Sequence, residues 1–141
     1  MSIQVLLDAP KHPARDAAIQ SIRCVETKDR EGWLALWDDD GIIEDPVGPS
    51  PLDPEGRGHR GKEKIAAFYD NVIAPVDLRF CIRQSFACGS ECANVGTITS
   101  RLANGAVSRT ELVMVYRLND AGKVVSLRAF WEFGQTATNI F

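Results

Sequence analysis

Long apolar runs and clustered positive charge are both missing from this 141-residue chain. No stretch of about 18 apolar residues is present, and the first residues lack the basic-then-apolar pattern of a secretion signal. We therefore expect a cytoplasmic protein without a membrane partner. Sixteen Lys and Arg stand against 19 Asp and Glu, a formal net charge of -3, and no basic run occurs. This balance argues against nucleic acid as a partner, because phosphate binding depends on gathered Lys and Arg.

Cysteine and histidine are also scarce, at four and two residues. A chain of this length buries a core without staples, so the cysteines are not expected to form a disulfide framework. Cys88 and Cys92 flank a predicted hairpin turn, and His12 and His59 are isolated in loop-like segments. A zinc site usually needs a second pair of ligands, which is missing here. We expect no metal and no cofactor.

The composition is that of one ordinary globular domain, with 45% hydrophobic and 25% charged residues. No repeat, low-complexity segment or linker divides residues 1–141, and we place the core at about 12–135. Residues 46–61 contain four prolines and four glycines, which predicts a loop too long for a simple connection. We expect this loop to act as a flap over the interior.

Three helices are predicted in the first half of the chain. Apolar residues recur at three- and four-residue steps from Pro13 to Val25. Asp29 is a plausible N-cap for a second helix that runs to about Trp37. Gly41, four residues further on, is the expected stop signal for this helical segment. The third helix opens at Gly61 and continues through Val72.

The second half alternates between apolar and polar residues, which predicts long strands. Asn104-Gly105 indicates a type I′ hairpin turn, and Asn119 to Gly122 a second turn. Three helices followed by antiparallel strands predict an α+β fold with a curved sheet wrapped over the helices. The predicted strands cover residues 78–83, 93–102, 107–118 and 124–133.

The stretch around Asp45 carries the most specific chemical signal. Side chains alternate along a strand, so Asp45 shares a face with Ile43 and should lie at the edge of an apolar interior. Loss of hydration there raises the pKa of a carboxyl and makes it a usable general base near neutral pH. The alternative is structural, since an Asp before Pro46 and Gly48 also commonly caps a turn.

Three blocks of the sequence form a specific combination: Glu44-Asp45-Pro46-Val47-Gly48 after Trp37-Asp38-Asp39-Asp40, Ala67-Phe68-Tyr69, and residues 119–129. Together they resemble the bacterial Δ5-3-ketosteroid isomerases. These enzymes belong to the nuclear-transport-factor-2-like superfamily, with SnoaL-like polyketide cyclases among their relatives. The resemblance covers about residues 15–133 and implies a cone-shaped α+β fold.

The resemblance assigns roles to individual positions. It implies that Asp45 is the base, that Tyr69 supports the catalytic hydroxyl network, and that Trp131 lines the steroid pocket. The isomerases use an Asp base with one Tyr and one protonated Asp as oxyanion donors, as in a standard example of pKa tuning. Here the two donor positions carry Ser21 and Met114. Loss of one such donor typically costs about 10²–10³ in rate.

Two functions remain open from the sequence. In the first, Asp45 removes a proton next to a carbonyl of a steroid-like or polyketide-like molecule, and Tyr69, alone or with Ser21 and water, holds the enolate oxygen. In the second, the protein binds a flat hydrophobic ligand and does not catalyse a reaction on it. Both readings use one predicted contact set: Ser21, Trp33, Phe68, Leu112, Met114, Tyr116 and Trp131.

The other face of the last strand is mixed in character. It carries Phe130 between Arg128 and Glu132. A partly apolar, partly charged face suits a moderate interface with a polar rim. We therefore expect a homodimer formed through the sheet, and a third reading is that the Asp45 face is merely packed and the sheet serves to dimerise.

Overall fold

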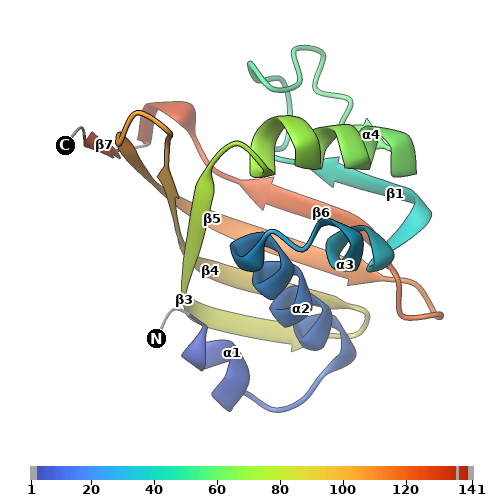
Figure 1. Ribbon diagram of the computed structural model, residues 1–141. Helices are drawn as coiled ribbons and strands as arrows, with labels where there is room; N and C mark the ends of the chain where they lie inside the picture. The colour runs from blue at the N-terminus through green and yellow to red at the C-terminus, as the bar shows by residue number, and fades with distance from the viewer. Residues whose placement is uncertain (1–2, 136, 140–141) are drawn as a thin grey trace.

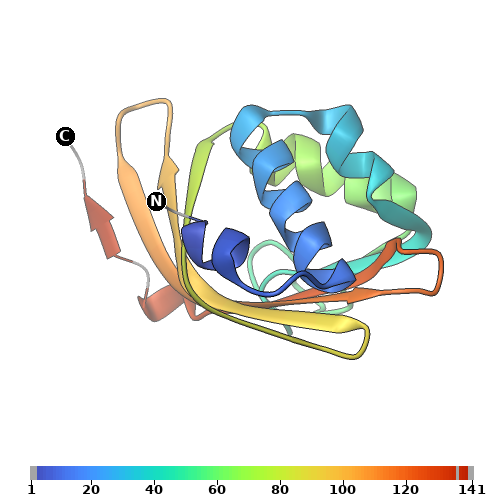
Figure 2. The ribbon, with the colours of Figure 1, turned by 90° about the horizontal axis from the view of Figure 1, so that it is seen from below.

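A computed structural model of the protein describes residues 3–135 and 137–139 and has helices packed in the concave face of a curved sheet (Figure 1, Figure 2). The strand order is β2-β1-β6-β5-β4-β3, and β7 pairs with β5. The described strand pairs are antiparallel except β1 with β6. The predicted α+β fold is confirmed. The strands are β1 (Trp37–Glu44), β2 (His59–Arg60), β3 (Asp77–Cys88), β4 (Glu91–Arg101), β5 (Val107–Leu118), β6 (Val124–Phe130) and β7 (Ala137–Asn139).

The helix predicted from Pro13 is the longest in the described chain, α2 (Pro13–Thr27). Pro13 occupies its first turn, and Nδ1 of His12 accepts the backbone N–H of Ala14 at 3.1 Å. Its small residues face the sheet, and Ala14 and Ala18 are fully buried. The other helical segments are α1 (Gln4–Asp8), α3 (Arg30–Ala35), α4 (Lys62–Phe68), the π-helical η1 (Tyr69–Ile73) and the 3₁₀ turn η2 (Phe133–Gln135).

The N-terminal helix α1 forms a packing arm. In α1, Leu6 is buried, and the helix lies against β3. The third predicted helix is present as α4 continued by η1, which together cover the predicted span to Val72.

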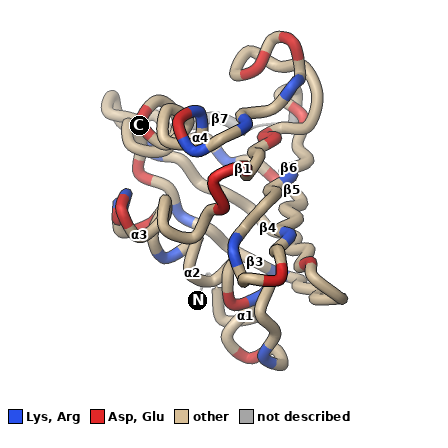
Figure 3. The backbone as a smooth tube through the Cα atoms, turned by 90° about the vertical axis from the view of Figure 1, so that its right-hand side faces the viewer, with Lys and Arg blue, Asp and Glu red and all other residues tan. Residues whose placement is uncertain are grey.

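The second predicted helix is shorter than expected, and its predicted end is wrong. Helix α3 stops at Ala35, whose carbonyl accepts Nζ of Lys123 at 2.8 Å, and the acidic run that follows lies in β1 (Figure 3). Acidic side chains at a helix C-terminus oppose the helix dipole, whereas the parallel pairing of Trp37 with Val124 stabilises a strand. Gly41 is therefore a strand residue and not a helix stop. The backbone is closely packed at this position, because an added Cβ would lie 2.8 Å from the Trp37 ring.

The β4–β5 hairpin is present, but its turn is not the predicted type I′. That type requires a positive φ at both central residues, and within this turn only Gly105 has one, at 88°. The N–H of Gly105 donates to the carbonyl of Leu102 at 3.0 Å, as in a type I turn followed by a left-handed glycine. The Asn104 side chain accepts the N–H of Ala106 at 2.9 Å, which stabilises this alternative.

The inner face of the sheet builds one core with the helices. Leu112, Met114, Tyr116 and Leu118 are all buried on β5, as the alternation predicts. The last strand ends at Phe130 rather than at Phe133, so the chain turns away just before Trp131. In the part of the chain that the structure describes, no helix is long and apolar enough to cross a bilayer. The four cysteine thiols are free.

Candidate active site

A cavity of about 610 Å³ lies between the inner face of the sheet and the helices. Its lining is mostly apolar and comes from α2, α3, α4, η1, β3, β4, β5, β6 and the chain after β6. Asp45 contributes to this lining, as does Leu52 of the loop predicted to act as a flap. All seven residues of the predicted contact set line the cavity: Ser21, Trp33, Phe68, Leu112, Met114, Tyr116 and Trp131.

Asp45 reaches the cavity from the end of β1. The strand is anchored by Ile43, which is fully buried, and the peptide bond to Pro46 is cis. The N–H of Val47 then donates to the carbonyl of Ala129 at 2.9 Å, which fixes the chain beside β6. Asp45 is half-buried, and it forms part of the cavity wall.

The surroundings of Asp45 favour its protonated form. Burial raises the pKa of the Asp45 carboxyl, and two smaller effects oppose it: the hydrogen bond from Trp131 and the charge of His59. Nε1 of Trp131 donates to Oδ1 of Asp45 at 2.6 Å. Trp131 itself packs on the ring of Phe133, with centroids 4.4 Å apart. The result is an oriented carboxyl with one oxygen bound to the indole.

Ser21, Tyr116 and Trp33 form a second polar group in the cavity. The hydroxyl of Tyr116 donates to Oγ of Ser21 at 2.9 Å, and Nε1 of Trp33 donates to the same oxygen at 3.1 Å. Burial raises the pKa of Tyr116 to about 12, with the Ser21 hydrogen bond opposing and the charge of Asp45 adding to the rise. The Tyr116 phenol therefore stays protonated at neutral pH.

Tyr69 lies behind the cavity wall, not in it. Its ring packs against Trp33, with centroids 5.4 Å apart, and it is not among the lining residues. Burial raises the pKa of Tyr69, and the larger charge effects on its phenol come from the surface groups Asp29, Arg30 and Asp70. This placement does not support a role for Tyr69 at the substrate oxygen.

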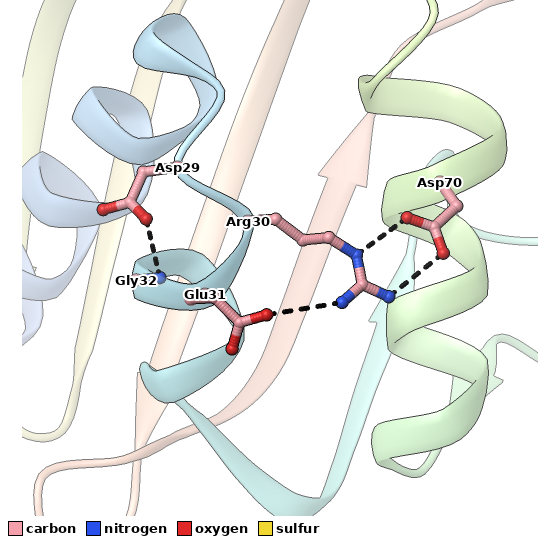
Figure 4. A network of polar contacts seen from close by, with 5 residues as sticks. All are labelled: Asp29, Arg30, Glu31, Gly32 and Asp70. Atoms are coloured by element: carbon pink, nitrogen blue, oxygen red, sulfur yellow. Dashed lines mark hydrogen bonds and ion pairs between the residues drawn. The ribbon is translucent and has the colours of Figure 1, made fainter.

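The charged groups near Tyr69 join α3 to η1, the helical segment that carries Asp70 (Figure 4). Nε of Arg30 donates to Oδ1 of Asp70 at 2.8 Å, and its NH2 group donates to Oδ2 at 3.1 Å. Asp29 caps α3 by accepting the N–H of Gly32 at 2.9 Å. These contacts are exposed, so they orient the helices rather than act in the cavity.

The sequence missed His59, which lies beside the site on β2. Residue His59 pairs with Ile43 across the strands, and its ring lies 5.1 Å from that of Phe68. Its Nε2 is enclosed and has no hydrogen-bond partner among the described residues. The alternation of β4 and β5 could have predicted two further lining residues, Ser100 and Ser108, which are cross-strand partners. Within the described ranges, no group of three or more His, Cys, Asp or Glu is arranged to hold a metal ion.

Comparison with known proteins identifies the family of this chain. Residues 18–127 match the family model of the SnoaL-like domain, and the chain belongs to this family. Its fold is similar to that of Δ5-3-ketosteroid isomerase from Mycobacterium sp., with a TM-score of 0.88 and 38% sequence identity over 92% of this chain and 100% of that one.

Two further solved structures are similar over nearly the whole chain. RV0760c from Mycobacterium tuberculosis in complex with estradiol-17beta-hemisuccinate matches with a TM-score of 0.86 and 38% identity, covering 90% of this chain and 99% of that one. A computationally designed 17-OHP binder matches with a TM-score of 0.88 and 36% identity, covering 92% and 100%. The family is therefore clear, and relatives with this fold bind steroid ligands.

Proposed function

We propose that this protein catalyses proton transfer at a carbon next to a carbonyl of a steroid-like or polyketide-like ketone, with Asp45 as the general base. One observation carries the proposal: a carboxyl with a raised pKa projects into a mostly apolar cavity. A base whose pKa lies nearer the working pH transfers protons more effectively than a free Asp. The 38% identity to a Δ5-3-ketosteroid isomerase supports the same chemistry.

The proposed reaction moves one proton and one double bond. Asp45 takes the proton from the carbon between the ketone and the isolated double bond. The C–H electron pair forms a new C=C bond, and the carbonyl π pair moves onto oxygen to give a dienolate. Protonated Asp45 then returns the proton at the far carbon, and the double bond ends in conjugation with the restored carbonyl. Trp131 holds Oδ1, which leaves Oδ2 of Asp45 for the proton.

The test follows the conjugated-enone absorbance after a Δ5-3-ketosteroid is mixed with the purified protein. We expect growth above the buffer rate, and a loss of about 10²–10⁴-fold in Asp45→Asn, the range for a general base. The Asn side chain is close in size and still offers an oxygen to Trp131, so the comparison isolates the proton transfer. An enone signal that persists unchanged in Asp45→Asn contradicts the proposal.

A second candidate is a steroid-binding protein without turnover. It is favoured by Ser21 and Met114 at the positions where the isomerases carry their oxyanion donors, and by the similarity to a designed 17-OHP binder. Its signature is saturable steroid binding in the wild type with no enone growth. Asp45→Asn then leaves the affinity close to that of the wild type.

The assembly belongs to the same proposal. The outer face of the sheet carries Phe130 at 42% exposure beside Val95 and Val113, and these residues border a shallow hollow of about 560 Å³. This face suits a homodimer contact, because exposed apolar patches rimmed by charge commonly mark protein interfaces.

A further inference from the structure

The imidazole of His59 is enclosed beside the site, and one of its nitrogens lacks a partner. Nε2 is buried and makes no hydrogen bond to the residues that the structure describes. The ring packs against Phe68, which lines the cavity, with centroids 5.1 Å apart. Buried polar atoms are normally hydrogen-bonded, so an enclosed ring nitrogen without a partner indicates a role beyond packing.

The register of β1 and β2 places His59 next to Asp45. His59 is the cross-strand partner of Ile43, and such partners share one face of the sheet. Asp45 follows Ile43 by two residues, one position past the end of β1, so its side chain lies on the same face. Diagonal neighbours of this kind are roughly 7–8 Å apart, which is within reach of an aromatic ring. The charge of His59 acts on the Asp45 carboxyl, in agreement with this placement.

The other charged groups around β2 are directed away from this face or are already bonded. The elements that pack against β2 are β1 and α4. On β1, Glu44 lies on the opposite face and accepts Nε of Arg128 at 3.3 Å. On α4, Nζ of Lys62 donates to a β1 carbonyl at 2.8 Å. The remaining ones are exposed or bonded to other groups: residues 38–40, Asp53, Arg57, Arg60, Glu63 and Lys64.

We propose that His59 is a positioning residue for the general base: its imidazolium lies beside the Asp45 carboxylate and holds that group ionised, so the protonation of His59 adjusts the basicity of Asp45. A buried cation is tolerated beside an opposite charge, and the carboxylate supplies that charge. When Asp45 takes up a proton, this attraction is lost. The charge of His59 therefore makes Asp45 a weaker base that is ionised over a wider range of pH. Because histidine is the side chain that ordinarily changes charge near neutrality, the contact makes the base sensitive to pH.

An NMR titration of the Asp45 carboxyl carbon tests this contact without turnover. The wild type should show a main inflection from Asp45 itself and a smaller one that coincides with the titration of the His59 ring protons. In His59→Gln the smaller inflection should vanish. The main one should move to higher pH by about one unit, the effect of a unit charge at this distance. Arg60→Gln is the matched control, because it removes an exposed charge from the adjacent residue and should leave both inflections in place.

Ionic strength separates an enclosed charge from a surface charge. Salt at about 1 M screens exposed charges strongly and buried pairs much less. We expect the difference between the wild type and His59→Gln to persist in this salt. His59→Phe keeps an aromatic ring against Phe68 without the charge and should titrate like His59→Gln. It carries the test, together with the two inflections of the wild type, if circular dichroism shows that His59→Gln is unfolded.

Turnover gives a second readout, which rests on the proposed function. The acidic limb of the kcat/KM profile reports the base of the free enzyme, so it should move to higher pH in His59→Gln by the same amount as the carbon titration. Arg60→Gln should keep the limb of the wild type. A loss of kcat at all pH values without movement of the limb indicates a structural role and overturns the inference.

The outcomes separate this inference from the proposed function. A single inflection in the wild type, or an unmoved Asp45 titration in both His59 variants, overturns the inference. An equal movement in Arg60→Gln also overturns it, because the effect then comes from the general charge of the surface. A movement that depends on His59 in a protein without turnover supports the contact and contradicts the proton transfer alone.

Discussion

The indole N–H of Trp131 meets Oδ1 of Asp45 at 2.6 Å, across 86 residues of chain. This contact joins the end of β1 to the segment that follows β6, and the two strands lie side by side in parallel. The bond stabilises the charged carboxylate, so it opposes the effect of burial on the pKa of Asp45. The acidity of the carboxyl thus reflects two opposing contributions from different parts of the fold.

Replacing Trp131 should change the pH dependence of the proposed reaction. Trp131→Phe removes the donor and leaves burial less opposed, so the pKa of Asp45 rises further. Since the base acts when deprotonated, the acidic limb of the kcat/KM profile should move to higher pH. Trp37→Phe is the control, because Trp37 is buried outside the cavity lining. An unmoved limb in Trp131→Phe contradicts the assigned role of this hydrogen bond.

The stability of the folded protein should depend on Asp45 in a defined direction. Burial raises the folded pKa above the ordinary 3.8, so between these two pKa values the folded state holds the proton that the unfolded chain has lost. Wild-type stability therefore falls as pH rises through this interval. Asp45→Asn lacks the effect and should be more stable than the wild type at neutral pH, with the advantage disappearing below pH 3.8.

Urea unfolding at several pH values measures this difference. Asp70→Asn serves as the opposite case, because the hydrogen bond from Arg30 lowers the pKa of Asp70. Its stabilising contribution is present above the unfolded pKa and lost as pH falls through the folded one, so Asp70→Asn should be the less stable variant at neutral pH. If Asp45→Asn is destabilised at neutral pH, Asp45 acts as a turn cap.

The two tyrosines of the chain should respond differently to the loss of their hydroxyls. Tyr116→Phe removes a hydrogen-bond donor to Ser21 inside the cavity. Tyr69→Phe removes a hydroxyl that lies outside the cavity lining and is influenced by the charges of Asp29 and Arg30. We expect a marked loss of kcat in Tyr116→Phe and a much smaller one in Tyr69→Phe. Steady-state assays of both variants in parallel make the comparison, and a larger loss in Tyr69→Phe restores the role that the family resemblance implied.

The proposed dimer predicts a change of mass on a single substitution. Phe130→Glu places a charge at the centre of the outer sheet face, beside Arg128, whose guanidinium lies 5.2 Å from the Phe130 ring centroid. We expect a dimer mass for the wild type and a monomer mass for this variant by light scattering. Leu7→Glu changes another exposed apolar residue, at 45% exposure, on α1 rather than on the outer sheet face, and should remain dimeric. A wild-type monomer contradicts the expected assembly.

Much of the fold followed from local sequence patterns. The small and apolar residues after Pro13 recur with a helical period, and their burial against the sheet confirms α2. Alternation along residues 107–118 predicted the inward face of β5, and the shared face of Ile43 and Asp45 predicted where β1 delivers its carboxyl. These features depend on neighbours within a few residues, which the sequence displays directly.

Other features depended on tertiary contacts. Local signals favoured a helix continuing to Trp37, but parallel pairing with β6 selects a strand there, and that pairing joins residues far apart in the chain. The family resemblance favoured Tyr69 over Tyr116 for the hydroxyl network, because no local signal shows where either hydroxyl points. In the fold the Tyr116 hydroxyl reaches Ser21 across 95 residues, whereas the Tyr69 ring packs against Trp33. The sequence gives the chemical type of each side chain, whereas the fold determines which partner its polar atoms contact.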